Sequence, residues 1–152
     1  MQLSAAGLAL LKRSEGFCNQ TYLDVAGYPT IGYGHCLRAS ESYPNGILEP
    51  QAEELLARDV RGAEEAVQRL VRVPLTQGQF DALVDFVFNL GAGRLAVSTL
   101  LKELNAGKYD AAAQQLLLWD HSGVREIASL QARRAAEFQL WGRSGDAQET
   151  AA

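Results

Sequence analysis

Cysteine is scarce in this chain of 152 residues, which contains only Cys18 and Cys36. Two cysteines cannot build a disulfide-rich scaffold, and neither has the Cys-x-x-Cys spacing of a zinc site. A bridge across the intervening hairpin, or a metal pair with His35, can be imagined. Because His121 is an equally weak ligand candidate, we expect free, buried or half-buried thiols, no metal and no cofactor.

A long apolar run is also missing. Residues 1–13 are rich in apolar side chains, but this stretch is too short to span a bilayer, and no basic leader precedes it. We therefore expect no signal peptide and no membrane insertion, so that the protein folds in a cytoplasm. If its target lies outside, another agent must give it access.

Clustered basic residues are absent as well. The formal net charge is −4, which argues against nucleic-acid binding, because neutralising phosphates requires grouped lysine and arginine. Arginines recur in the segment 58–72, but acidic residues are interleaved with them, and this pattern is typical of a solvated helix face. What is present, 47% apolar and 21% charged residues, is the composition of a globular protein.

Helix signals surround a short β segment near the N-terminus. Ser4 is suited to cap a helix running to about Ser14, and Gly16 supplies the stop. Residues 21–37 predict two or three short strands, with a first turn near residues 25–28. Pro29 cannot donate a ladder hydrogen bond, so its strand lies at an edge or begins there.

The rest of the chain is predicted to be helical. Pro50 suits the first turn of a long helix to about Leu70, and a capping box at 76–79 opens a very apolar helix. Further helices are expected at 98–105, 110–119 and 129–141. The predicted fold is α+β and mainly α, in one domain: a small β lobe (about 15–48), a connecting helix (about 50–72), an all-helical lobe (1–14 and 74–142), a cleft between the lobes, and a loose tail (143–152).

Two acids and a hydroxyl, Glu15, Asp24 and Thr30, lie within sixteen residues of one another. This is the equipment for cleaving a glycosidic bond, in which one carboxylic acid protonates the leaving oxygen while a second carboxylate activates water or attacks the sugar. Glu15 falls near a helix C-terminus and on its apolar face. Both features disfavour the carboxylate, so we expect Glu15 to stay protonated and act as general acid.

Asp24 follows a strand at a polar turn and should stay ionised. If the hairpin pivots at Gly27, Asp24 and Thr30 sit opposite each other and can hold a water aimed at the anomeric carbon, which is the inverting arrangement. The rival is that Asp24 attacks directly and Thr30 positions it. Both residues are expected on an exposed hairpin, where substitution costs little stability.

Several segments together resemble the phage-type lysozymes, glycoside hydrolase family 24. The motifs are Glu-Gly-Phe at 15–17, Tyr-Leu-Asp at 22–24 and Gly-Tyr-Pro-Thr-Ile-Gly-Tyr-Gly-His at 27–35, with further similarity at 79–93 and at 130–137, where Arg133-Arg134 stands. The resemblance extends to about residue 142. It implies a lysozyme-like fold and a muramidase that hydrolyses the β-1,4 bond between N-acetylmuramic acid and N-acetylglucosamine in peptidoglycan. We expect the protein to be a monomer.

The resemblance also implies residue roles. Glu15 is the acid, Asp24 and Thr30 handle the water, and Asn89 and Tyr33 are expected to contact the saccharide. His35 is expected to pair with Asp59 and so to link the sheet to the long helix. We therefore expect an endolysin that serves host lysis at the end of phage infection.

Two departures and two alternatives accompany this interpretation. We find neither the N-terminal membrane segment of signal-anchor endolysins nor an added wall-binding domain, so we expect release through a holin lesion into a Gram-negative periplasm. The lysozyme of T-even phages, a member of the family, is strongly basic, whereas this chain is acidic, so steering to an anionic wall should be weaker or confined to the cleft. One alternative is a lytic transglycosylase, which needs the glutamate alone. The other is a catalytically silent peptidoglycan-binding module that kept the fold.

Overall fold

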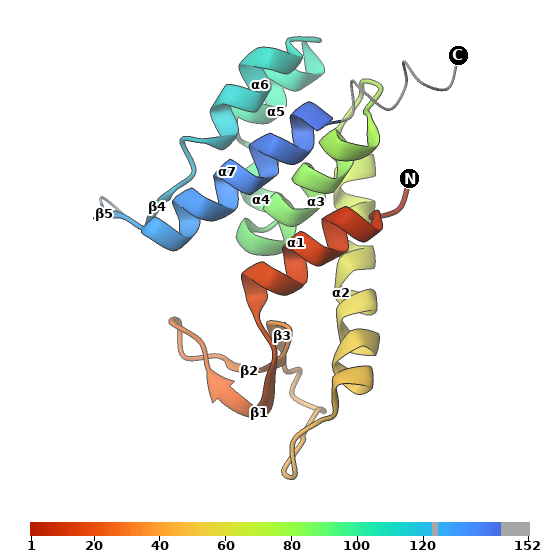
Figure 1. Ribbon diagram of the computed structural model, residues 1–152, viewed down its shortest axis with the longest axis vertical. Coiled ribbons are helices and arrows are strands. Elements are labelled where there is room, and N and C mark those ends of the chain that lie inside the picture. The colour runs from red at the N-terminus through yellow and green to blue at the C-terminus, as the bar shows by residue number, and fades with distance from the viewer. Residues whose placement is uncertain (123–124, 144–152) are drawn as a thin grey trace.

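The computed structural model describes residues 1–122 and 125–143 and confirms a mainly helical α+β fold. A three-stranded sheet lies at one end of the molecule, most helices gather at the other, and α2 runs between them (Figure 1). In chain order the elements are α1 (Ala5–Glu15), β1 (Cys18–Leu23), β2 (Pro29–Gly32), β3 (His35–Cys36), α2 (Glu49–Leu70), α3 (Gln77–Leu90), α4 (Ala92–Ala96), α5 (Thr99–Asn105), α6 (Tyr109–Leu116), β4 (His121–Ser122), β5 (Arg125–Glu126) and α7 (Ala128–Arg143). Apart from residue 143, the predicted tail lies outside the described residues, among which no helix is long and apolar enough to cross a membrane.

Helix α1 begins and ends at the predicted signals. The Ser4 hydroxyl accepts a hydrogen bond from the backbone N–H of Gly7 at 3.2 Å, and it donates to the carboxylate of Asp81, a buried residue of α3. At the other end Gly16 adopts a φ of +69°, and its N–H donates to the Lys12 carbonyl. The Ser4 cap therefore attaches the start of α1 to the core. Gly16 ends the helix, so that Glu15 is its last residue.

The small sheet is antiparallel in the order β1-β2-β3. Tyr22, not Asp24, is the cross-strand partner of Thr30, so the predicted Asp24 and Thr30 pairing is wrong. The reason is the turn: the Asp24 N–H donates to the Tyr28 carbonyl at 2.9 Å, which centres the hairpin one residue earlier than predicted. The sequence allowed Pro29 either to lie in an edge strand or to begin its strand. It begins β2, which is the central strand of the sheet.

The long helix α2 contacts the sheet near its N-terminal end and α3 further along. Its first turn is closed by the Gln51 side chain, which accepts a hydrogen bond from the Leu48 N–H at 2.8 Å. Gly32 of β2 has a φ of +67°, and a Cβ at this position would lie 3.1 Å from the Ala52 Cβ. The sheet approaches α2 closely because this position has no side chain.

Helix α3 forms the centre of the core. The predicted capping box is present, with Thr76 and Gln79 exchanging side-chain to backbone hydrogen bonds. Phe80, Leu83 and Phe86 are at most 1% exposed. Helix α3 contacts α1, α2, α4 and α7, so neighbouring helices pack against the side chains on its surface.

The helical part of the molecule is not all helix, as the sequence had suggested. Strands β4 and β5 pair with each other before α7, and the short helix α4 was not predicted. Helix α6 ends at Leu116 instead of residue 119, and Leu118 is 65% exposed. Strands of two residues show no alternation of apolar and polar side chains, so the sequence pattern cannot reveal them.

Both cysteines are free thiols in the structure. Cys18 is half-buried, as expected, but Cys36 is exposed, so the expectation of burial is wrong for this residue. The two lie on the outer strands β1 and β3, with β2 between them.

Candidate functional site

Glu15 is held where α1 meets the sheet. Gly16 ends the helix, and the turn between β2 and β3 passes directly beside the carboxylate. Gly34 in this turn has a φ of +70°, and a Cβ built on it would lie 2.5 Å from Glu15 Oε2. Only glycine fits at this position, because the backbone conformation and the close carboxylate both exclude a side chain.

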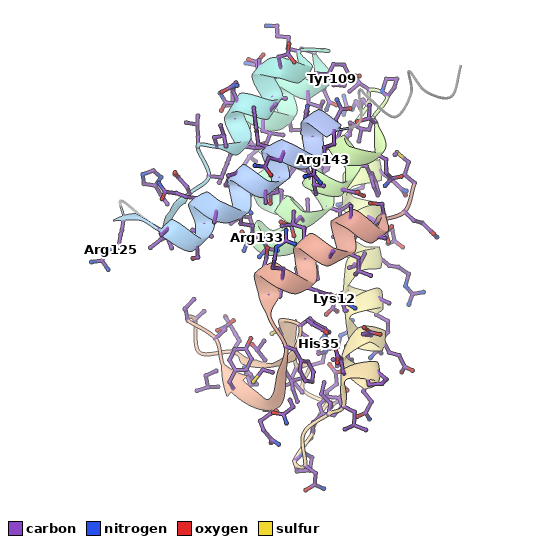
Figure 2. All side chains as sticks on the ribbon, viewed as in Figure 1. Lys12, His35, Tyr109, Arg125, Arg133 and Arg143 are labelled. Atoms are coloured by element: carbon purple, nitrogen blue, oxygen red, sulfur yellow. The ribbon has the colours of Figure 1, made fainter. Side chains whose placement is uncertain are left out.

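The other carboxylate oxygen of Glu15 is bound by an arginine from α7. Arg133 Nη1 donates to Glu15 Oε1 at 2.8 Å, while its Nε and Nη2 donate to the two carboxylate oxygens of Asp85 at 2.8 and 2.9 Å. Figure 2 shows Arg133 between α7 and α1. The Asp85 side chain is 0% exposed and the Arg133 side chain 7%, so Arg133 connects the candidate acid to the core.

Two carboxylates keep Arg133 charged. Burial by itself would lower the pKa of Arg133, but the hydrogen bonds and charge of Asp85, together with Glu15, raise it above its ordinary value. The sequence places Glu15 on the apolar face of its helix and does not predict this cation beside it. The cationic group that faces Glu15 comes from a helix far along the chain.

A depression of about 560 Å³ lies beside Glu15. Its lining includes Glu15 and Arg13 from α1, Asn89 from α3, and Ser129 and Arg133 from α7. Asn89 is half-buried, and that it contacts a saccharide stays a prediction. Its amide oxygen accepts a hydrogen bond from Arg134 Nη2 at 2.8 Å.

Asp24 caps the turn that joins β1 to β2. Its Oδ1 accepts hydrogen bonds from the backbone N–H groups of Ala26 at 2.9 Å and Tyr28 at 2.8 Å. In the part of the chain that the structure describes, Oδ2 makes no hydrogen bond. One oxygen of Asp24 therefore shapes the hairpin, and the other is available to a water or a substrate.

Thr30 is buried, contrary to the expectation of an exposed position. The residue is only 4% exposed, and its Oγ1 donates a hydrogen bond to the Tyr28 carbonyl at 3.0 Å. Tyr22 lies opposite it in the neighbouring strand and is 38% exposed. Burial, and then the charges of Glu15, Cys18 and Asp24, raise the pKa of the Tyr22 phenol.

Tyr33, expected to contact the saccharide, faces α2 instead. It is 5% exposed, and its hydroxyl donates to Glu49 Oε1 at 2.7 Å. This hydrogen bond, then burial and the Glu49 charge, raise the pKa of Tyr33 to about 12. Tyr33 does not line the depression beside Glu15, and its side chain holds the sheet against α2.

His35 and Asp59, expected to pair, are in contact. His35 Nδ1 lies 2.7 Å from Asp59 Oδ2, and Nε2 lies 3.1 Å from both oxygens of Glu41. The backbone N–H of Arg38 is the main cause that lowers the pKa of Glu41, and His35 adds to it against the opposing effect of burial. The imidazole therefore joins β3, α2 and the loop between them (Figure 2).

The site includes residues whose roles the sequence did not reveal. Arg133 belongs to a motif that the resemblance covers, but nothing in the local sequence says that it contacts Glu15. Tyr22 stands two residues before Asp24, and i, i+2 spacing in a strand does place side chains on one face. Among the described residues, no group of three His, Cys, Asp or Glu side chains could hold a metal ion.

Together, a small antiparallel sheet, a helical group, one long helix between them and a carboxylate beside a depression at their junction define a lysozyme-like protein. Solved structures agree. The muramidase domain of SpmX from Asticaccaulis excentricus is 36% identical, with a TM-score of 0.86 over 93% of this chain and 97% of that one. A variant of the phage P22 lysozyme is 40% identical, with a TM-score of 0.82 over 93% of this chain and 98% of the other.

Sequence comparison identifies the family. Residues 12–137 match the phage lysozyme family, so the chain belongs to it. The endolysin of Salmonella phage P22 is 42% identical over 137 residues, which are 88% of this chain and 94% of the relative. The endolysin of Bacillus phage B103 is also 42% identical, over 144 residues, but this chain spans only 54% of that relative's length.

Proposed function

We propose that this protein is a peptidoglycan-lytic endolysin that hydrolyses the β-1,4 bond between N-acetylmuramic acid and N-acetylglucosamine. The observation that carries the proposal is the position of Glu15, at the edge of a depression and opposite a charged arginine, in a chain whose relatives are named endolysins. A muramidase domain among the similar structures supports the choice of bond. The sheet and the helical group would act as two lobes with the glycan between them.

In this proposal Glu15 is the proton donor. Arg133 occupies Oε1, so Oε2 is the oxygen left to carry the proton to the leaving glycosidic oxygen. When the proton has left, Arg133 stabilises the carboxylate that remains. The fixed guanidinium needs no rearrangement at that moment, because Asp85 already holds it in place.

Asp24 and Thr30 would hold the attacking water. The Thr30 hydroxyl donates its proton to the Tyr28 carbonyl, so it can offer only lone pairs to a water molecule. Asp24 Oδ2 likewise offers only lone pairs. A water that donates one hydrogen to each turns its own lone pair outward, toward an anomeric carbon, which supports the inverting mechanism; direct attack by Asp24 is the rival.

Product analysis tests the reaction. Purified peptidoglycan treated with the protein should yield muramic acid with reducing ends, of which fresh product has the inverted anomeric configuration by NMR. Retained configuration would support direct attack by Asp24. A dominant anhydromuramic product would identify a lytic transglycosylase and overturn hydrolysis.

A turbidity assay tests catalysis itself. Permeabilised Gram-negative cells should clear with the wild-type protein and not with Glu15→Gln, which keeps the side-chain shape but has no acidic proton. Equal clearing rates for the two proteins would contradict an enzymatic role and leave the silent binding module.

We further propose that the protein is a monomer that serves host lysis, reaching the wall in the periplasm after a holin opens the membrane. The endolysin relatives support this role. Expression in a bacterial host with and without a holin tests it: lysis should require the holin, and lysis in its absence would contradict the proposed route. Size-exclusion chromatography with light scattering tests the monomer.

A further inference from the structure

A buried arginine determines which way the Asn89 amide faces. Arg134 is 0% exposed, and its Nη2 donates to Asn89 Oδ1 at 2.8 Å and to Glu137 Oε1 at 2.7 Å. Its guanidinium carbon lies 5.1 Å from the centre of the Phe86 ring. These three contacts come from α3 and α7 and hold the guanidinium in one place.

The chemistry of arginine then fixes the amide. A guanidinium has only donors, so the atom of Asn89 that faces it must be the carbonyl oxygen, and the opposite orientation would set donor against donor. The two N–H groups on Nδ2 must therefore point away from Arg134. Considering residues 1–122 and 125–143, Nδ2 has no hydrogen-bond acceptor in the protein.

The free donors lie at the proposed active site. Asn89 lines the same depression as Glu15 and Arg133. The acetamido and hydroxyl oxygens of a glycan are acceptors, and a site built to donate to an acceptor discriminates strongly against a ligand that lacks it.

We propose that Arg134 is a positioning residue, which holds the Asn89 amide so that its two donors face the depression and select an acceptor oxygen of the bound glycan. The inference rests on the proposed function, because it requires a saccharide in this depression. The family resemblance already implies that Asn89 contacts the saccharide, and the inference adds an indirect role for Arg134, which acts through Asn89.

A double-mutant cycle separates positioning from simple structural support. Asn89→Ala should raise KM about tenfold with kcat nearly unchanged, as expected for the loss of one hydrogen bond used equally in the ground and transition states. Removing the Arg134 donor should raise KM to a similar extent in the wild-type background. In the Asn89→Ala background the same removal should have no further effect on KM, because the group it positions is gone.

Arg134 is best replaced together with its partner. Burial raises the pKa of Glu137, and it lowers that of Arg134, so both charges are costly where they lie. The pair Arg134→Met with Glu137→Gln removes the donor to Asn89 and both charges, and it leaves no unpaired ion. Tyr109→Phe, which loses a hydrogen bond to the Pro74 carbonyl on the far side of the helical group, is the control for a loss of stability without a change in KM.

A measurement on the unmodified protein keeps the test independent of folding. In ¹⁵N NMR spectra the Asn89 side-chain NH₂ signals should shift on addition of tri-N-acetylchitotriose. The inference is overturned if these signals stay in place while backbone signals of the depression shift, or if the Arg134 replacement raises KM equally with and without Asn89. Failure of wild-type protein to cleave peptidoglycan at all would instead overturn the proposed function.

Discussion

Replacing Arg133 by methionine should strongly destabilise the protein. The substitution removes the only side chain among the described residues that forms an ion pair with Asp85, whose side chain is 0% exposed. A buried carboxylate left without its partner costs about 3–5 kcal/mol of unfolding free energy. The Glu15 contact adds less, because the Glu15 side chain is 19% exposed and water replaces the lost hydrogen bond in part.

The loss of unfolding free energy lowers the melting temperature, Tm. For a protein of this size each kcal/mol lowers Tm by about 2–4 °C, so Arg133→Met should lower it by about 6–20 °C. Thermal denaturation followed by circular dichroism at pH 7 measures the effect. The double variant Arg133→Met with Asp85→Leu should recover a large part of the loss, since it removes both buried charges.

A matched control lies on the same helix. Arg143, in the last turn of α7, is exposed (Figure 2), and Arg143→Met should change the unfolding free energy by no more than about 0.5 kcal/mol. If Arg133→Met melts within a degree or two of Arg143→Met, the ion pair with Asp85 is not what holds α7 to α3. If the double variant is as unstable as Arg133→Met, the buried charge is not the cause.

Further predictions concern the sheet and its turns. Gly34→Ala should lower turnover on peptidoglycan at least tenfold, because the new methyl group would displace Glu15; unchanged kinetics would contradict the observed close contact. Asp24→Asn should abolish most turnover with little change in Tm, since an amide oxygen can still accept the turn hydrogen bonds. Thr30→Ala should lower turnover and also cost about 1 kcal/mol in urea denaturation, the worth of its bond to a carbonyl. The pKa of Glu41 is lowered, so its stabilising ionisation is complete above the ordinary value of 4.5 and is lost as pH falls through the lower folded-state pKa; Tm of the wild type should fall below that pH, and that of Glu41→Gln should fall less.

Features that depend on neighbouring residues were predictable from the sequence. Ser4, Thr76 and Ser98 each cap a helix through the N–H three positions further along the chain, as their spacing predicts. Gly16 ends α1 because the left-handed conformation favours glycine. Signals of this kind need no knowledge of the tertiary fold, which is why the order of the long helices was predicted well.

Features that depend on distant or fine packing were not predictable. Arg133 is 118 residues from Glu15 in the chain, and the packing of α1 and α7 against α3 and against each other brings them together. Which residue lies opposite Thr30 depends on the register of the β1–β2 hairpin, and in the structure it is Tyr22 instead of Asp24. That register is set by the Asp24 turn, and a shift of one residue exchanges the two faces of a strand.

The two halves of the proposed catalytic machinery are attached to the molecule in different ways. Glu15 is connected through Arg133 to Asp85 in the centre of the core. Within residues 1–122 and 125–143, Asp24 is hydrogen-bonded only to the backbone of its own hairpin turn. Side chains of that turn are exposed, Val25 fully and Tyr28 at 60%. A glycan bound between the halves would therefore adjust the hairpin more readily than the acid, because moving Glu15 breaks buried ion pairs and moving Asp24 breaks none. The separation of the two carboxylates, on which the choice between an activated water and direct attack depends, is then set mainly by where the hairpin settles on the substrate.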